Sequence, residues 1–72
     1  MEGQKKRAYM IMRRKQNLMS QIEVAKTLGI SQAQYSYIEN GYADPDEAQA
    51  KTLISMLGLP DDYFDKKDDG ND

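Results

Sequence analysis

The chain contains no cysteine and no histidine among its 72 residues. This absence excludes disulfide bridges, thiol nucleophiles, histidine acid–base catalysis and the usual zinc ligand sets. The four serines have no histidine to activate them, and the five glycines are scattered rather than gathered in a phosphate-binding loop. The sequence therefore predicts a protein that is not an enzyme and that holds no metal or cofactor.

Long hydrophobic stretches are also missing. The apolar run at residues 8–12 is five residues long, whereas a signal peptide needs about 7 to 15 apolar residues and a membrane span about 18. A small domain without cysteine is typical of a reducing compartment. We therefore expect a soluble, cytoplasmic protein.

Charge is divided unevenly along the chain, although the net charge is only −2. Residues 1–41 hold seven basic and three acidic residues, a net charge of +4, whereas residues 42–72 hold three basic and nine acidic residues, a net charge of −6. A basic half of this kind indicates nucleic-acid contact, but a solvated basic helix has the same composition. Charge alone leaves both interpretations open.

Helical patterns cover most of the sequence, and strand patterns are absent. Ser20 begins one helix as an N-cap, with Glu23 completing a capping box, and Gly29 ends that helix. Ser31 caps the next helix, which ends at residues 40–41. Three more helices are predicted. The first covers residues 4–17. The second begins with Asp44 as its N-cap and Pro45 in its first turn and ends at Gly58, and the third is a last turn over residues 60–64.

These helices are too short to be stable alone, so they must share one core. The sequence predicts a compact all-α domain of five helices over residues 1–65, followed by a disordered acidic tail over residues 66–72, which has no apolar residue. The expected core positions are Val24, Ala25, Leu28, Ile30, Tyr35 and Ile38, together with the stripe Ala50, Leu53, Ile54 and Leu57.

The helices at residues 20–29 and 31–40 form the main motif. Two short helices that cross at a tight turn need a small residue at their contact and a residue with positive φ in the turn, as Ala25 and Gly29 provide. With these two positions and those given next, residues 9–64 resemble the helix-turn-helix domain of the phage-repressor type. This family is also called the Cro/repressor or xenobiotic-response-element family. The matching positions are Ser20, Gln21, Ala25, Gly29, Ile30, Ile38, Glu39, Gly41, Pro45 and the run 53–59.

The resemblance implies a sequence-specific, double-stranded-DNA-binding transcriptional regulator, with repression as the expected role. Its recognition helix, residues 31–40, would lie in the major groove with its first residues at the base edges. Glutamine can bond to adenine and alanine can contact a thymine methyl group, which predicts A·T character in the site. The expected base contacts are Gln32, Ala33, Gln34 and Ser36.

Contacts to DNA phosphates are expected from other positions. Gln21 lies in the first turn of a helix, where the backbone favours an anion and where the family places a contact to the DNA backbone. The other expected phosphate contacts are Tyr37, Lys5, Lys6, Arg7, Arg13 and Lys15. Arg14 differs, because the family pairs an arginine here with a glutamate; the resemblance therefore implies a structural ion pair between Arg14 and Glu39.

A domain of this size makes few DNA contacts, and a homodimer on a pseudo-palindromic site would double them. Leu59, Tyr63 and Phe64 form the expected dimer surface, because two aromatic residues in a last short helix offer more apolar area than a small core needs. The same aromatic residues could instead cap the core.

A protein-interaction module is the alternative function, for example an antirepressor or a partner of another regulator that binds DNA weakly. It is suggested by the absence of basic residues in the helix at 31–40, by Ile22, Tyr37 and Tyr42, and by the acidic second half of the chain. Because one fold supports several functions, the resemblance does not separate the two hypotheses.

Overall fold

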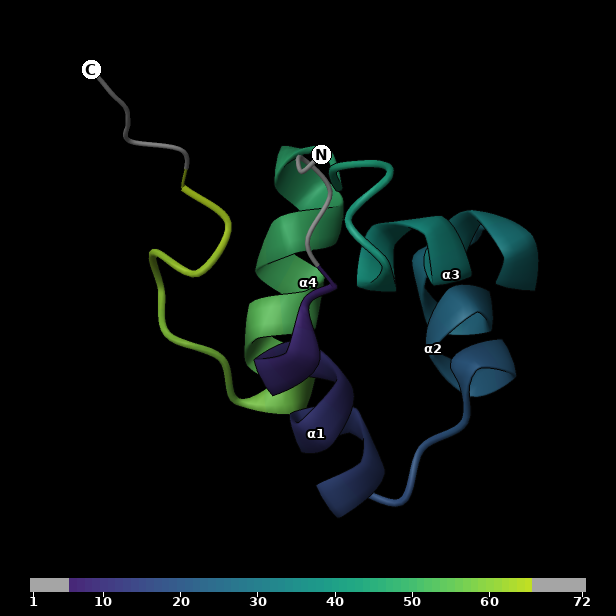
Figure 1. Cartoon of the computed structure of the whole chain (residues 1–72), viewed down its shortest axis with the longest axis horizontal. Helices are drawn as coiled ribbons and strands as arrows, with labels where there is room; N and C mark the ends of the chain where they lie inside the picture. Colours follow the sequence, from purple (N-terminus) through teal and green to yellow (C-terminus); the bar gives the residue numbers. More distant parts are fainter. Residues whose placement is uncertain (1–5, 66–72) are drawn as a thin grey trace.

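Four α-helices make up the structured part of the chain. A computed structural model describes residues 6–65, with α1 (Ala8–Gln16), α2 (Gln21–Leu28), α3 (Gln32–Glu39) and α4 (Glu47–Leu57). In Figure 1, α2 and α3 lie together on one side of the molecule, and α1 and α4 lie on the other side. The described part of the chain contains no strand, and the all-α class is confirmed. None of these four helices is long and apolar enough to cross a membrane.

The predicted fifth helix is wrong. Residues 60–64 form hydrogen-bonded turns instead, in which the Tyr63 N–H donates to the Pro60 carbonyl at 3.0 Å and the Asp65 N–H donates to the Asp62 carbonyl at 3.0 Å. Each of these bonds spans three residues, whereas an α-helix has hydrogen bonds that span four residues. The predicted acidic tail, residues 66–72, lies outside the described residues.

The N-termini of α2 and α3 are confirmed as predicted. At α2 the Glu23 N–H donates to Ser20 Oγ at 3.1 Å, and the Ser20 N–H donates to Glu23 Oε1 at 2.8 Å. Ser31 forms the same reciprocal capping box with Gln34 at α3. Gly29 ends α2 with φ +74°, the left-handed conformation that glycine adopts without strain.

The first helix is shorter than predicted. It begins at Ala8 and ends at Gln16, whereas residues 4 and 5 of the predicted helix lie outside the described residues. Arg7 is the N-cap of α1 with ψ 72°, outside the helical range, and its N–H donates to the Glu39 carbonyl at 2.7 Å. This bond joins the start of α1 to the end of α3.

The start of the fourth helix also differs from the prediction. Asp46 is the N-cap rather than Asp44: the Gln49 N–H donates to Asp46 Oδ1 at 2.8 Å, and the Asp46 N–H donates to Gln49 Oε1 at 3.0 Å. Pro45 therefore precedes the cap instead of lying in the first turn. Gly58 ends α4 as predicted, with φ +71°.

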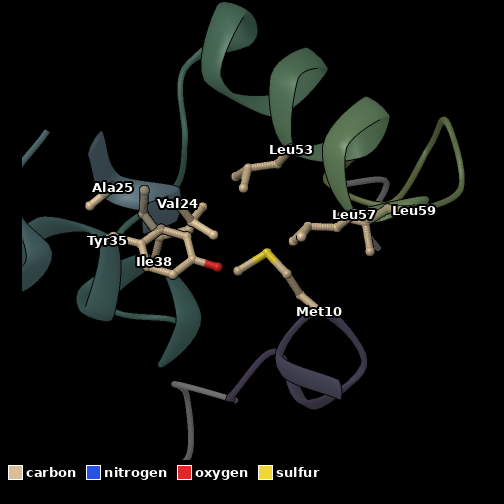
Figure 2. Close-up of a cluster of buried hydrophobic side chains, with 8 residues drawn as sticks. All are labelled: Met10, Val24, Ala25, Tyr35, Ile38, Leu53, Leu57 and Leu59. Carbon is tan, nitrogen blue, oxygen red and sulfur yellow. The ribbon is translucent and has the colours of Figure 1, made fainter. Parts of the chain in front are cut away.

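The core lies where the four helices meet (Figure 2). Side chains from every helix converge there, and each Val, Leu, Ile or Met adds about 1.5 to 3 kcal/mol of hydrophobic stabilisation when fully buried. The buried apolar residues are Met10, Val24, Ala25, Tyr35, Ile38, Leu53, Leu57 and Leu59, with Leu28, Ile30 and Ile54 packed against them. The predicted inward positions of α2 and α3 are therefore confirmed.

Candidate nucleic-acid interface

The turn between α2 and α3 sets the angle of the exposed helix. The Ile30 N–H donates to the Ala25 carbonyl at 3.0 Å, which closes the turn after Gly29. Ala25 is 2% exposed, and its small side chain lets the two backbones approach. As a result α3 buries Tyr35, Ile38 and Glu39 and presents its other residues to solvent.

A buried ion pair joins α1 to α3. Arg14 Nε donates to Glu39 Oε2, Arg14 Nη2 donates to Glu39 Oε1 at 3.2 Å, and Arg14 Nη1 donates to the Met19 carbonyl at 2.9 Å. The hydrogen bond to Glu39 raises the pKa of Arg14. Burial opposes ionisation of Glu39, but the hydrogen bonds from Arg14 and Gln21 outweigh it and lower the Glu39 pKa. The structure thus places both residues of the expected pair in contact.

The hydroxyl of Tyr35 lies beside this ion pair. Burial raises the pKa of Tyr35, and the neighbouring carboxylate of Glu39 raises it further. Figure 2 shows the hydroxyl directed toward Met10. Tyr35 therefore stays neutral across the physiological pH range.

Two glutamines extend this network to the surface. Gln21 Nε2 donates to Glu39 Oε1 at 2.9 Å, and Gln32 Nε2 donates to Gln21 Oε1 at 3.2 Å. Gln21 is the first residue of α2 and Gln32 is the first residue of α3. The first turns of the two helices are consequently fixed relative to one another by side-chain hydrogen bonds that begin at the buried carboxylate.

The other expected base-contact residues have different surroundings. Gln34 Oε1 accepts the Ser31 N–H at 3.0 Å, so this side chain is part of the α3 cap. Ser36 is half-buried, and its hydroxyl accepts a bond from Asn40 Nδ2 at 3.3 Å. Ala33 is exposed. The structure therefore leaves Gln32 and Ala33 more available for an external contact than Gln34 and Ser36.

Arg7 is bound within the protein. Its Nη1 donates to the Ile38 carbonyl at 2.6 Å and to the Ala43 carbonyl at 3.0 Å, and its Nη2 lies 2.7 Å from Asp44 Oδ1. The guanidinium also lies over the ring of Phe64, 5.4 Å from its centroid. These contacts tie the start of α1 to the loop after α3, so they argue against the expected phosphate contact.

Arg13 has a similar internal position at the end of α4. Its Nε donates to the Leu57 carbonyl at 3.0 Å, and its Nη1 donates to Gln16 Oε1 at 2.9 Å. A cation that bonds a last-turn carbonyl also stabilises the helix dipole. This arginine therefore caps α4, a role that differs from the expected phosphate contact.

The lysines expected at phosphates are less constrained. Lys6 and Lys15 are exposed and flank a shallow hollow on α1, lined by Ala8, Ile11 and Met12. Lys5 lies outside the described residues. Tyr37 is 56% exposed, and its ring packs edge-on against Tyr42.

The residues of the expected dimer surface pack inward. Leu59 is 6% exposed and belongs to the core. The Tyr63 hydroxyl accepts the Met10 N–H at 3.2 Å, and its ring packs edge-on against Phe64 at a centroid distance of 5.0 Å. Tyr9 also contacts Tyr63, at 5.9 Å. The structure thus favours the alternative in which these aromatic residues cap the core.

The Ser31 cap was predicted, but the capping role of Gln34 and the capping box of Asp46 with Gln49 were missed, although the sequence contained a signal for each. A capping box needs Ser, Thr or Asp followed three residues later by Glu or Gln. The segment 31–34 has this spacing with Ser31 and Gln34, and the segment 46–49 has it with Asp46 and Gln49. Recognising the first pattern would have assigned Gln34 to the helix cap before assigning it to DNA.

Comparison with known proteins identifies the family. The Helix-turn-helix family model matches residues 10–64, which include all of α2, α3 and α4 and most of α1. No curated protein and no solved structure matches the chain. The family match covers well over half of the chain, and its tight α2–α3 corner fits the motif expected from Ala25 and Gly29. The chain therefore belongs to the phage-repressor type of the helix-turn-helix family.

Proposed function

We propose that this protein is a sequence-specific transcriptional regulator that binds double-stranded DNA and inserts α3 into the major groove. Membership of a DNA-binding helix-turn-helix family supports DNA as the ligand. The hydrogen bond between Gln32 and Gln21 carries the proposal, because it prepares a base-reading side chain at the first turn of α3. A side chain fixed before binding loses less conformational entropy on the DNA.

Gln32 and Ala33 are the proposed base contacts at this end of α3. Gln32 donates one amide hydrogen to Gln21, which leaves its other amide hydrogen and its carbonyl oxygen for an adenine. Adenine N7 accepts and adenine N6 donates, so the remaining groups match both atoms. Ala33 would contact a thymine methyl group. We therefore expect A·T pairs where the first turn of α3 meets the DNA.

Phosphate contacts are proposed for the first turn of α2 and for exposed lysines. The positive end of the α2 dipole lies at Gln21, while Lys15 on α1 and Lys6 just before it supply charge. Arg7 and Arg13 are omitted because their guanidinium groups bond within the protein. With few cations available, we propose that the protein represses as a homodimer on a pseudo-palindromic site, with half-sites about 34 Å apart.

Selection from a random-sequence duplex pool tests this proposal. The purified protein is incubated with the pool at about 50 and 200 mM salt, and the retained DNA is sequenced. We expect a two-fold symmetric motif with A·T pairs in each half-site. A motif without symmetry would contradict the homodimer but not DNA reading, whereas retention without any motif would contradict the proposed function.

A protein-interaction module is the second candidate, and two exposed side chains favour it. Ile22 is 58% exposed in the first turn of α2, and Tyr42 is 64% exposed after α3. The described part of α3 also carries no basic residue. If the pool selection retains no motif at either salt concentration, these two residues become the first positions to substitute in a search for a protein partner.

A further inference from the structure

The two exposed tyrosines beside α3 form a fixed pair. The ring of Tyr37 packs against the ring of Tyr42 at a centroid distance of 6.2 Å and an angle of 81°. The N–H groups of Tyr42 and Ala43 both donate to the Tyr37 carbonyl, at 2.9 and 3.3 Å. Gly41, with φ +82°, reverses the chain between the two rings. Tyr42 therefore holds the Tyr37 ring in place, although both rings remain more than half exposed.

Tyr37 shares the outward face of α3 with Ala33. Residues four apart lie on one face of a helix, and long side chains lean toward the helix N-terminus. Tyr37 and Ala33 are therefore neighbours on this face of α3. Because Tyr35, Ile38 and Glu39 define the buried side, Ala33 and Tyr37 lie near the centre of the exposed side.

Gln34 is constrained by its cap. Its Oε1 accepts the Ser31 N–H, and its own N–H donates to Ser31 Oγ at 3.1 Å. A move of this side chain toward a base would break the capping box. Tyr37 is long, exposed and already oriented, so it is better suited than Gln34 to a base contact.

We propose that Tyr37 is a specificity-determining residue that contacts a base pair, and that Tyr42 is its positioning residue. The inference rests on the proposed DNA binding, and it changes the role expected for Tyr37 from a phosphate contact to a base contact. The phenol supplies a hydroxyl that hydrogen-bonds a base edge and a ring that packs on a thymine methyl group. The base pair read by Tyr37 would lie beside those read by Ala33 and Gln32.

The test compares the motifs selected by four proteins: wild type, Tyr37→Ala, Tyr42→Ala and Tyr42→Phe. Tyr37→Ala should lose the base preference at one position of each half-site and bind the wild-type motif about tenfold more weakly. Tyr42→Ala should weaken the preference at that same position. Tyr42→Phe should keep it, because phenylalanine retains the edge-to-face contact with Tyr37.

Two controls separate a base contact by Tyr37 from misfolding and from a phosphate contact. Thermal unfolding of each variant identifies any loss of binding that follows from misfolding. If Tyr37→Ala misfolds, Tyr42→Ala carries the comparison, with Tyr42→Phe as its matched control. A uniform loss across all sequences would show that Tyr37 contacts a phosphate and would overturn the inference. An unchanged motif in both alanine variants would also overturn it, while the wild-type motif would still support DNA reading. A wild-type protein that selects no motif would overturn the proposed function and this inference together.

Discussion

Gln21 Nε2 donates a hydrogen bond to Glu39 Oε1 at 2.9 Å, and this contact joins the buried ion pair to the exposed first turns of α2 and α3. The same carboxylate accepts bonds from Arg14 on α1. Glu39 thus connects three helices through one side chain that is 1% exposed. Buried charged groups are costly unless every polar atom is paired, so removal of a partner should have large effects.

Glu39→Gln should change the pH dependence of stability. Its hydrogen bonds lower the folded-state pKa of Glu39 below the unfolded value of about 4.3. The ionised carboxylate therefore adds stability above about pH 4.3, and this contribution is lost as the pH falls through the lower folded-state pKa. Thermal unfolding between about pH 3 and pH 7 measures the effect. The variant should lose about 3 to 5 kcal/mol at neutral pH, because Arg14 remains buried without a countercharge, and should show a flatter profile in acid.

The matched control for this variant is Glu47→Gln. Glu47 lies 3.7 Å from Lys51 on α4, and both side chains are exposed. Exposed ion pairs contribute little to stability, so this variant should unfold as the wild type does at neutral pH. Equal acid profiles for Glu39→Gln and the wild type would contradict the role assigned to the buried carboxylate.

Gln32→Ala and Gln34→Ala should change different properties, the base preference and the stability respectively. Gln34→Ala removes the N3 side chain of a capping box and should cost up to about 1 kcal/mol of stability while keeping the base preference. Gln32→Ala removes a surface side chain and should keep the stability but lose the preference for one adenine. Urea unfolding and pool selection measure both properties. A changed motif in Gln34→Ala with unchanged stability would contradict this division.

Local patterns in the sequence predicted much of this fold. Ser20 and Glu23 are three residues apart, and Gly29 follows the last apolar residue of α2, so the bounds of that helix depend on neighbours in the chain. At residues 44–46 two aspartates flank a proline, and either aspartate could be the N-cap of α4. The prediction assigned the cap to Asp44, whereas the structure has it at Asp46. The prediction of a fifth helix at residues 60–64 was wrong, because aromatic residues near Pro60 indicate burial but do not specify a helix.

The long-range contacts of the arginines could not be predicted from such patterns. Arg7 bonds Ala43, 36 residues later, and Arg13 bonds Leu57, 44 residues later. A basic residue on a short helix has the composition of a phosphate contact whether its guanidinium meets DNA or a backbone carbonyl. Only the packed arrangement of α1, α3 and α4 separates a phosphate contact from an internal hydrogen bond. Of the arginines, the family resemblance assigned only Arg14 to an internal contact.

Leu18→Gly should stabilise the protein. Leu18 has φ +58° at the end of α1 and is 90% exposed, so its side chain gains little from folding. The left-handed conformation costs a non-glycine residue about 1 to 2 kcal/mol, while glycine loses about 0.5 to 1 kcal/mol more entropy on folding. A net gain of about 0.5 to 1 kcal/mol in urea unfolding is expected. Leu18→Ala keeps the strain and should be close to neutral; a similar gain in that variant would attribute the effect to the lost apolar side chain.

Gly58→Ala should destabilise the protein more than Gly29→Ala. Both glycines have positive φ, +71° and +74°, so both variants incur the same backbone strain of about 1 to 2 kcal/mol. A Cβ at Gly58 would lie 2.6 Å from Arg13 Nη2, whereas a Cβ at Gly29 meets no atom within 4 Å. The added methyl group must displace the guanidinium that bonds the Leu57 carbonyl, at a further cost of about 1 kcal/mol for the lost hydrogen bond.

The double variant Arg13→Ala with Gly58→Ala isolates that contact. With the guanidinium removed, alanine at position 58 should cost only the backbone strain, so Gly58→Ala should destabilise the Arg13→Ala protein by about as much as Gly29→Ala destabilises the wild type. Urea unfolding of the four proteins in the cycle gives the coupling energy between the two positions. Additive effects would contradict the close packing of Arg13 against the end of α4, and would leave its guanidinium available for the DNA phosphate that the sequence first suggested.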